Sequence, residues 1–330
     1  MSTTITPSAS RSRREMAHLA ARATLPVALL IVFSFFAVAA PGFLTAGNLR
    51  SLLVDHFVVL AFVAGAMTLV VIAGGIDLSL GTAADMASLA FAQSLLSGLG
   101  FGAALAAALA AALAVGLFNA LLIGVAGIAP FLATLGTLFI GQSVQQLASD
   151  GGQTIYLMNM RLPSAIGFVA RGTVFGVPMP ILLVGVCLAG LWLLTERTVF
   201  GQRILAVGLQ RSTARLSGLP VRRDTALVYV LAAECCAVTG ILLSCTVKSY
   251  APGAGNAYVL DAIGATFIGT TLHRNHRPSV VGTMLGVLML SVVADGLVLV
   301  GWSFEWQQVA SGLLVLGILA ISFGTARSRI

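Results

Sequence analysis

The sequence has very little charge. Only 9% of its 330 residues are Asp, Glu, Lys or Arg, whereas a soluble domain carries about 25%. Hydrophobic residues make up 58% of the chain, and the mean hydropathy is +1.01. Apolar runs cover most of the length, so no soluble domain of ordinary size fits between them. The composition therefore predicts a polytopic membrane protein.

Lysine is almost absent, with Lys248 as the only one. A nucleotide-binding P-loop needs a lysine in the pattern G-x-x-x-x-G-K-[ST]. Val247 stands where that pattern requires glycine, so this chain cannot hold the motif. If ATP drives its activity, another polypeptide must bind the nucleotide.

Cysteine and histidine are scarce, and neither forms a chemical motif. No H-E-x-x-H pattern is present, and His273 and His276 lie in an arginine-rich segment, where solvated loop residues are expected. The cysteines fall in apolar runs without metal spacing, which predicts small core residues and no disulfide framework. They are Cys187, Cys235, Cys236 and Cys245. We expect no catalytic residue, metal, cofactor or enzymatic activity.

The long hydrophobic runs predict an all-α fold of about ten transmembrane helices within residues 23–325. A helix needs about 20 apolar residues to cross the hydrocarbon core. One run, 259–272, is too short for an untilted crossing and is interpreted as a tilted or partial span. The candidate spans are 24–40, 56–73, 82–99, 101–124, 130–147, 179–195, 225–247, 259–272, 279–300 and 306–323.

Arginine accounts for nearly all of the positive charge and lies between these runs. It is concentrated in the N-terminal tail, in residues 196–224 and 273–278, and in the C-terminal tail. This distribution indicates topology rather than nucleic-acid binding, because cytoplasmic loops are enriched in Lys and Arg. If the chain crosses the membrane ten times, all four arginine-rich segments lie on the same side of the membrane. We therefore expect both termini to be cytoplasmic and residues 149–178 and 248–258 to be periplasmic.

The two ends are expected to be tails. Residues 1–22 are polar and predict a disordered cytoplasmic segment, and residues 326–330 form a second cytoplasmic tail. A cleaved signal peptide is an alternative for the first run, since Ala37-Val38-Ala39 mimics a cleavage site. An uncleaved first span explains the same pattern, because further spans follow at once.

Polar and glycine residues gather in one stretch between the second and third spans, GGIDLSLG at positions 74–81. The glycine pair weakens the first helix, and Asp77 or Ser79 can cap the next one. A carboxylate at the membrane centre costs about 2.5–3.5 kcal/mol. The stretch is therefore expected to line a polar cavity, pack against protein or lie at a water interface. The alternative is a simple connection in which Asp77 is a solvated cap.

Acidic residues in or beside the spans leave a second class of function open. A proton- or sodium-coupled carrier would use them as relays or ion sites, so an ion-coupled secondary transporter of a small polar solute is the alternative. No Lys or Arg within the spans could pair with these acids, which argues against a secondary transporter. No ring-forming filter motif favours a channel. The acids are Asp77, Asp85, Glu234, Asp261 and Asp295.

Several stretches resemble the membrane permease subunits of ribose-type ABC sugar importers. GGIDLSLG resembles the signature of that family. AVG at 206–208 followed by ARLSGLPV at 214–221 resembles its cytoplasmic loop. LDAIGA at 260–265, IGT at 268–270, VVGT at 280–283 and WQQV at 306–309 match its late segments. The resemblance covers roughly residues 40–325. The chain departs from the family at QRST, 210–213, and HRNHRP, 273–278, which bears on its choice of ATPase and sister permease.

The resemblance implies a transport subunit of the bacterial inner membrane. Two permease chains, identical or not, would form a pathway for a small sugar such as a pentose. A periplasmic binding protein would deliver the sugar, and a separate ATP-binding subunit would drive transport. The helix break and path are then assigned to Gly74, Gly75, Asp77, Ser79 and Asp261.

The same resemblance places ATPase docking in the cytoplasmic loop 196–224. Residues 201–218 are expected to form one short helix at the membrane surface, with Arg211 and Arg215 one turn apart. The assigned docking residues are Arg203, Arg211, Arg215, Ser217 and Gly218.

Overall fold

The computed structural model describes residues 25–158, 161–272 and 277–327. The predicted disordered tail, residues 1–22, lies outside the described residues, as do positions 328–330 of the C-terminal tail and most of the 273–278 segment. Each of the ten predicted runs carries a helix in the part of the chain that is described.

The first half of the chain forms five helical spans in sequence. A helix over Leu25–Ala39 is followed by a continuous 27-residue helix, Ala46–Ile72, which contains one π-helical stretch. The same pattern recurs later, where a π-helical stretch extends α5. The segments are α2 (Ala46–Ser51), η1 (Leu52–Phe57), α3 (Val58–Ile72), α4 (Leu80–Leu96), α5 (Phe101–Asn119), η2 (Ala120–Val125) and α6 (Pro130–Ala148).

The second half is also helical, with shorter helices in the connections. One of these short helices, α7, lies within residues 149–178. The segments are α7 (Ser164–Arg171), α8 (Met179–Arg197), α9 (Val199–Leu209), α10 (Arg211–Leu216), α11 (Val221–Val247), η3 (Asn256–Tyr258), α12 (Val259–Thr270), α13 (Val280–Leu299) and α14 (Phe304–Arg327).

Two small antiparallel sheets modify the all-α prediction. β1 (Ile155–Tyr156) pairs with β4 (Ser249–Tyr250), and β2 (Thr173–Val174) forms a hairpin with β3 (Val177–Pro178). Phe175 and Gly176 at the hairpin turn both have positive φ, 51° and 81°. Such values are typical of tight two-residue hairpin turns. The fold is therefore a helical bundle with short strands only in its connections.

Among the described residues, five helices are long and apolar enough to cross a membrane by length and composition. They are Ala46–Ile72, Phe101–Val125, Met179–Arg197, Val221–Val247 and Val280–Leu299. This supports a multi-pass membrane protein. The count of ten crossings stays a prediction, as does the orientation of the termini.

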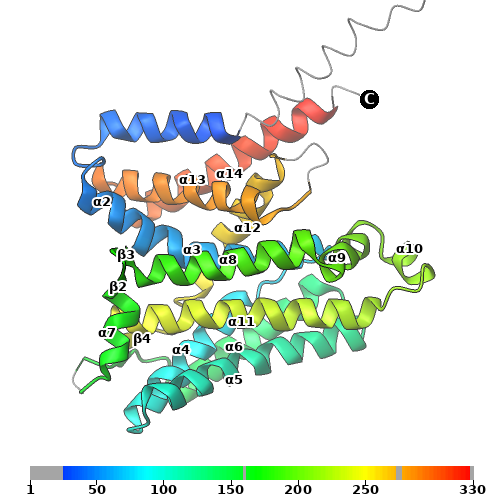
Figure 1. Ribbon diagram of the computed structural model, residues 1–330, viewed down its shortest axis with the longest axis horizontal. Coiled ribbons are helices and arrows are strands. Elements are labelled where there is room, and N and C mark those ends of the chain that lie inside the picture. The colour runs from blue at the N-terminus through cyan, green and yellow to red at the C-terminus, as the bar shows by residue number, and fades with distance from the viewer. Residues whose placement is uncertain (1–24, 159–160, 273–276, 328–330) are drawn as a thin grey trace, which may run out of the picture.

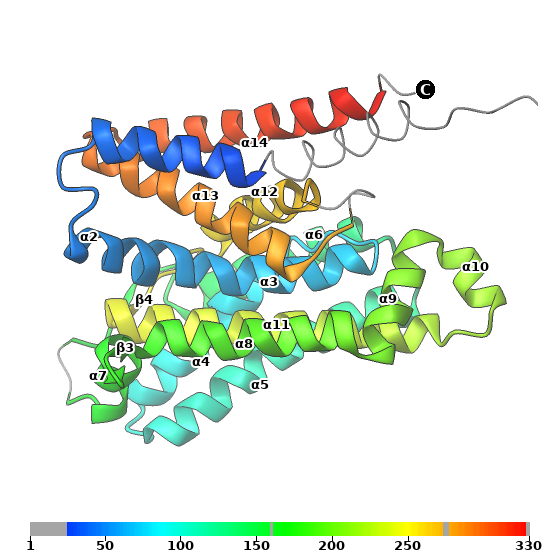
Figure 2. The same ribbon diagram turned by 45° about the horizontal axis from the view of Figure 1, so that its top comes forward.

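The main core lies where α3, α4 and α11 meet. α4 packs on α5, α11, α6 and α3, and α12 packs on α13 and α3. Fourteen of the fifteen α3 residues are buried, which fits a helix surrounded by other helices rather than lipid. The helices of the bundle run roughly lengthwise in Figure 1 and Figure 2. α2, α7 and the short strands lie at one end, and α9, α10 and the end of α14 lie at the other.

Residues 251–258 do not form a simple outer loop. Asn256 lies directly against Gly81 in the first turn of α4, so the segment extends along α4 to the level of the predicted helix break. α12 then has 12 residues, about 18 Å of helix at 1.5 Å per residue. This length covers only part of a crossing of about 30 Å.

Candidate functional site: a buried helix break beside a basic groove

The helix break between α3 and α4 begins where two backbones touch. Gly74 has φ +81°, which favours glycine, and a Cβ there would lie 2.9 Å from Gly208 Cα on α9. A Cβ on Gly75 would lie 2.5 Å from the Tyr229 hydroxyl on α11. Gly74 is therefore required both by close packing and by conformation, whereas at Gly75 the close contact is with the Tyr229 side chain.

A chain of hydrogen bonds ends on the Asp77 carboxylate. Asp77 and Ser79 are each 1% exposed. Asp77 Oδ1 accepts the Ser79 hydroxyl at 2.6 Å and the Ser79 backbone N–H at 2.8 Å. Asn119 Nδ2 donates to Ser79 Oγ at 2.6 Å, and Thr137 Oγ1 donates to Asn119 Oδ1 at 2.6 Å. The break is thus tied to both α5 and α6.

A second contact fastens the break to α6. The Leu78 backbone N–H donates to Thr134 Oγ1 at 3.1 Å. Buried backbone and side-chain groups need such partners, because water cannot reach them. The polar residues Asn119, Thr134 and Thr137 were missed by sequence reasoning, although each is a lone polar residue in an apolar run.

Two expectations for this stretch are wrong. The alternative of Asp77 as a solvated cap fails, because the side chain is buried. Ser79 occupies the N-cap position of α4, but no side-chain capping bond forms there; its hydroxyl donates to Asp77 instead. The Asp77 carboxylate bonds the N–H of Ser79 itself rather than one inside the helix. The stretch packs against protein, as the other interpretation predicted.

Asp261 lies apart from this network. It is in the first turn of α12 and is half-buried. Among the described residues, the hydrogen bonds around Asp77 do not include it. Its neighbour Leu260 is 74% exposed, so this turn of α12 lies at the surface of the single chain.

The predicted docking loop contains two helices, where one was expected. α9 starts at Val199, with the Thr198 hydroxyl accepting the Gly201 backbone N–H at 3.2 Å. The chain then breaks at Gln210, whose φ of −158° and ψ of 93° are extended, and α10 follows. The single-helix expectation is wrong, but α10 places Arg211 and Arg215 one turn apart, as predicted. α11 begins at Val221, earlier than the expected Thr225.

Ser217 and Gly218 form the C-terminal cap of α10. The Gly218 N–H donates to the Arg215 carbonyl at 3.1 Å, and the Leu219 N–H donates to the Ala214 carbonyl at 3.1 Å. Gly218 has φ +76°, and Ser217 is the C-cap. This is a Schellman ending, and the contact that usually accompanies it is present, since Leu219 packs on the small cluster containing Ala214. It turns the chain sharply into α11.

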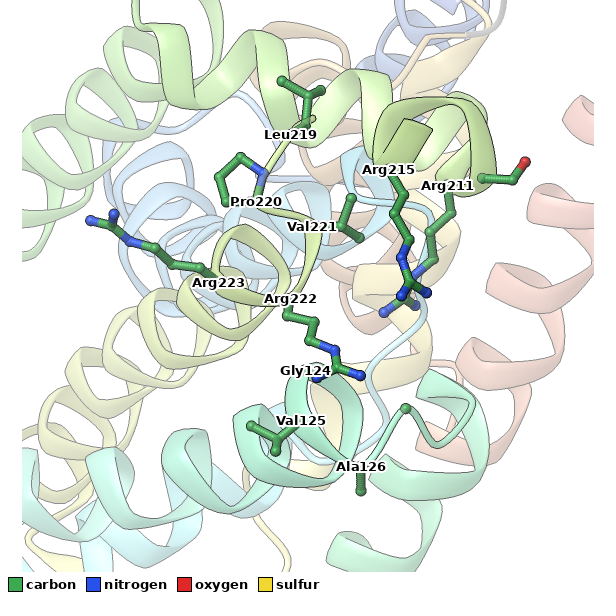
Figure 3. Close-up of a pocket in the computed structure, with 12 residues that line it drawn as sticks. Gly124, Val125, Ala126, Arg211, Arg215, Leu219, Pro220, Val221, Arg222 and Arg223 are labelled. Atoms are coloured by element: carbon green, nitrogen blue, oxygen red, sulfur yellow. The ribbon is translucent and has the colours of Figure 1, made fainter. Parts of the chain in front are cut away.

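A groove of about 910 Å³ lies between α10, the start of α11 and the end of η2 (Figure 3). Arg211, Arg215 and Arg222 point into it, and Arg223 points away. Within the described ranges no acidic side chain lines the groove, so it is strongly electropositive. It is lined by Gly124, Val125, Ala126, Gly127, Arg211, Ser212, Arg215, Leu219, Pro220, Val221, Arg222 and Arg223.

The other docking residue, Arg203, is half-buried on α9 and does not line the groove. Large apolar side chains that sequence reasoning missed flank α10 instead. Leu209 is 79% exposed and Leu216 is 89% exposed. The segment therefore offers both charge and apolar area at its outer surface.

The helix break and the loop helices meet at Gly208. A Cβ on Gly208 would lie 2.8 Å from Gly74 N and 3.0 Å from Ala73 C. α9 is thus in backbone contact with the end of α3 at the helix break. At the same end, Arg277 Nη2 pairs with Glu196 Oε1 at 3.3 Å and joins the last residues of α8 to the segment before α13.

Across the described ranges, no three His, Cys, Asp or Glu side chains gather in a way that could hold a metal ion. The bundle of apolar helices, several of them long enough to span a bilayer, defines a multi-pass membrane protein.

Comparison with known proteins identifies the family. Residues 48–319 match the family described as "Branched-chain amino acid transport system / permease component", and the chain belongs to it. The chain is 34% identical to ribose import permease protein RbsC of Bacillus subtilis (strain 168) over 288 residues, 87% of this chain and 88% of that one. The resemblance to ribose-type permeases is thereby confirmed.

Other relatives are named for a different solute. The autoinducer 2 import system permease protein LsrD of Photorhabdus laumondii is 30% identical over 308 residues, covering 93% of this chain and 92% of that one. LsrD of Yersinia enterocolitica is 31% identical and covers 84% of each chain. Among solved structures, PsaBC from Streptococcus pneumoniae in complex with Fab has a TM-score of 0.46 at 18% identity, over 86% of this chain and 93% of that one.

Proposed function

We propose that this chain is the permease subunit of an ABC importer for a small sugar, a pentose or similar monosaccharide. A periplasmic binding protein delivers the sugar, and a separate ATP-binding subunit drives transport across the bacterial inner membrane. The observation that carries the proposal is the backbone contact between Gly208 and Gly74, which connects the docking segment to the helix break. The relation to a ribose import permease supports the sugar class.

The pathway lies between two permease chains, along α6 and residues 251–261. α6 exposes Gln142, Ser143 and Gln146 on its outer face. The neighbouring segment 251–258 is non-helical apart from the single turn η3 and is partly exposed. Irregular backbone at membrane depth is tolerated only when protein covers it or when it lines a water-filled cavity. A second permease chain facing this surface across an aqueous path meets that requirement, and it gives Asp261 a place beside the path.

ATPase docking occurs at α9 and α10, through Arg203, Arg211, Arg215 and the turn at Ser217 and Gly218. The basic groove favours an acidic surface on the ATPase, since several arginines without acidic partners repel one another. The exposed Leu209 and Leu216 add apolar contact area. Movement of the docked ATPase then shifts α9, and Gly208 transmits the shift to the helix break.

Charge reversal in α10 tests the docking step. Arg211→Glu with Arg215→Glu should leave membrane insertion intact, because other arginines still mark this loop as internal. Interface charges left without partners commonly cost about 2–5 kcal/mol, so the ATPase should no longer co-purify and uptake should be lost. Arg223→Glu is a matched control, because this side chain points away from the groove.

The wild-type chain and the Arg223→Glu control should retain the ATPase. Normal co-purification with the double variant, together with continued uptake, would place docking elsewhere. The segment joining α12 to α13 would then be the next candidate.

A further inference from the structure

A second buried polar cluster lies between α4 and residues 251–258. Asp85 of α4 is 2% exposed, and its Oδ1 accepts the Gly255 backbone N–H at 2.6 Å. A Cβ on Gly255 would lie 2.7 Å from the Gly81 carbonyl oxygen and 2.9 Å from Asp85 Oδ1. One carboxylate oxygen thus holds the segment against α4, and the other oxygen is left for a different partner.

Three buried side-chain oxygens of α4 and residues 251–258 have no hydrogen-bond partner in the part of the chain that the structure describes. They are Asp85 Oδ2, Thr82 Oγ1 and Asn256 Oδ1. Thr82 precedes Asp85 by three residues on α4, so the two side chains share a face. Asn256 directly follows Gly255, and its Oδ1 touches Gly81 in the same turn of α4. Two separate elements therefore supply oxygen atoms to one small region.

The surroundings hold this region rigidly. Gln145 of α6 is 1% exposed, and its Oε1 accepts the Tyr250 hydroxyl and the Gly253 N–H, each at 3.2 Å. Gly141, one turn earlier on α6, packs directly against Thr82. Residues 251–258 are consequently hydrogen-bonded to α6 through Gly253 and to α4 through Gly255.

The Asp85 carboxylate has no cationic side chain beside it. Among the described residues, ion pairs join His56 to Asp295 and Arg277 to Glu196, and neither includes Asp85. Burying an ionised carboxylate is very unfavourable unless a counter-charge accompanies it. A carboxylate, a hydroxyl and an amide oxygen together form the type of donor set that hard cations prefer.

We propose that Asp85, Thr82 and Asn256 bind one sodium ion, which joins α4 to residues 251–258. A single carboxylate balances a single positive charge, whereas protein sites for divalent hard cations usually contain more carboxylate ligands. The ion serves the fold of the permease and is independent of the sugar and of the energy source for transport.

Thermal unfolding of the purified full-length permease in detergent tests this site. NaCl is titrated against choline chloride at constant ionic strength. Sodium should raise the apparent unfolding temperature by a few degrees in a saturable manner, because a ligand bound only by the folded state stabilises it. Asp85→Asn should remove the sodium dependence. Asp295→Asn is the matched control, since this buried acid is hydrogen-bonded to Asn48 at 2.7 Å and should keep the shift.

Thr82→Val provides a second variant that retains the charge. It removes one ligand oxygen and should raise the sodium concentration at half-effect about tenfold or more, equivalent to about 1.4 kcal/mol. Equal unfolding temperatures of the wild-type chain in sodium and in choline would overturn the proposal, since water would then satisfy these oxygens. Full sodium dependence in Asp85→Asn or in Thr82→Val would also overturn it. If Asp85→Asn does not fold, the wild-type titration and Thr82→Val decide the matter.

Discussion

Asp77 can be buried because protein groups replace the water that it loses. Ser79 offers both its hydroxyl and its backbone N–H, and Asn119 and Thr137 extend the chain of donors into α5 and α6. Hydrogen bonds to a charged acceptor are stronger than those between neutral groups. The Asp77 carboxylate therefore acts as a hydrogen-bonded anchor for the helix break.

Substitution of Asp77 separates this anchoring role from a role for its charge. Asp77→Asn keeps an oxygen acceptor for Ser79 and should retain most transport. Asp77→Leu leaves the Ser79 N–H and hydroxyl unpaired, at a cost of about 1–3 kcal/mol each, and should lose transport while the protein still inserts. Uptake assays normalised to membrane abundance measure both effects. Normal uptake by Asp77→Leu would show that the residue is dispensable.

The helix break at positions 74–81 could be predicted from the sequence, but the hydrogen-bond partners of this stretch could not. Glycines beside an acid in an apolar setting indicated the break. Asn119 lies 40 residues from Ser79, and Thr134 lies 56 residues from Leu78, so only the packing of α5 and α6 on α4 brings them together. The capping prediction was wrong because the Ser79 hydroxyl donates to Asp77 and accepts from Asn119 Nδ2, instead of accepting a backbone N–H in the first turn of α4.

At the level of secondary-structure elements, the apolar runs predicted helices at the right places. The sequence did not indicate the π-helical stretches within helices or the break between α9 and α10. The π-helical stretches LLVDHF and ALLIGV have no proline or glycine pair that would mark them. The break between α9 and α10 falls at Gln210, which also carries no turn signal. The path of residues 251–258 along α4 depends on bonds to Asp85 and Gln145, which are remote in sequence.

Contact between α9 and α3 is the element-level link in the proposed mechanism. Gly208→Ala adds a Cβ inside the van der Waals contact of Gly74 and should force the two backbones apart. We expect insertion to be retained and ATP-driven uptake to fall several-fold. Gly190→Ala on α8 is the control, because a Cβ there meets nothing within 4 Å and alanine favours the helix by about 1 kcal/mol. Equal uptake by the two variants would argue against coupling through this contact.

For the whole molecule, the arginine distribution predicts which end of the helical bundle is cytoplasmic, and this orientation stays a prediction. α9, α10 and the end of α14 share one end of the bundle, and α7 and the short strands share the other (Figure 1). The salt bridge from Arg277 to Glu196 joins two segments that were both predicted to be cytoplasmic.

Single cysteines in a cysteine-free background test sidedness and the aqueous path together. A membrane-impermeant thiol reagent added outside should label position 175, where Phe175 is fully exposed in the β2–β3 turn. It should also label position 142 on α6 if that face lines water. Position 210 should react only after the membrane is permeabilised, and position 186 on the lipid side of α8 should stay unreactive. Strong external labelling at 210 would contradict the proposed orientation.

The central claim is that this chain imports a sugar only as part of an ATP-driven assembly. Reconstitution into proteoliposomes with its ATP-binding subunit and sugar-binding protein measures this directly, using radiolabelled pentose and imposed ion gradients as separate energy sources. We predict uptake that requires ATP and both partner proteins and that is unaffected by collapsing a sodium or proton gradient. Uptake by the chain alone, driven by an ion gradient without ATP, would contradict the account and identify an ion-coupled secondary transporter.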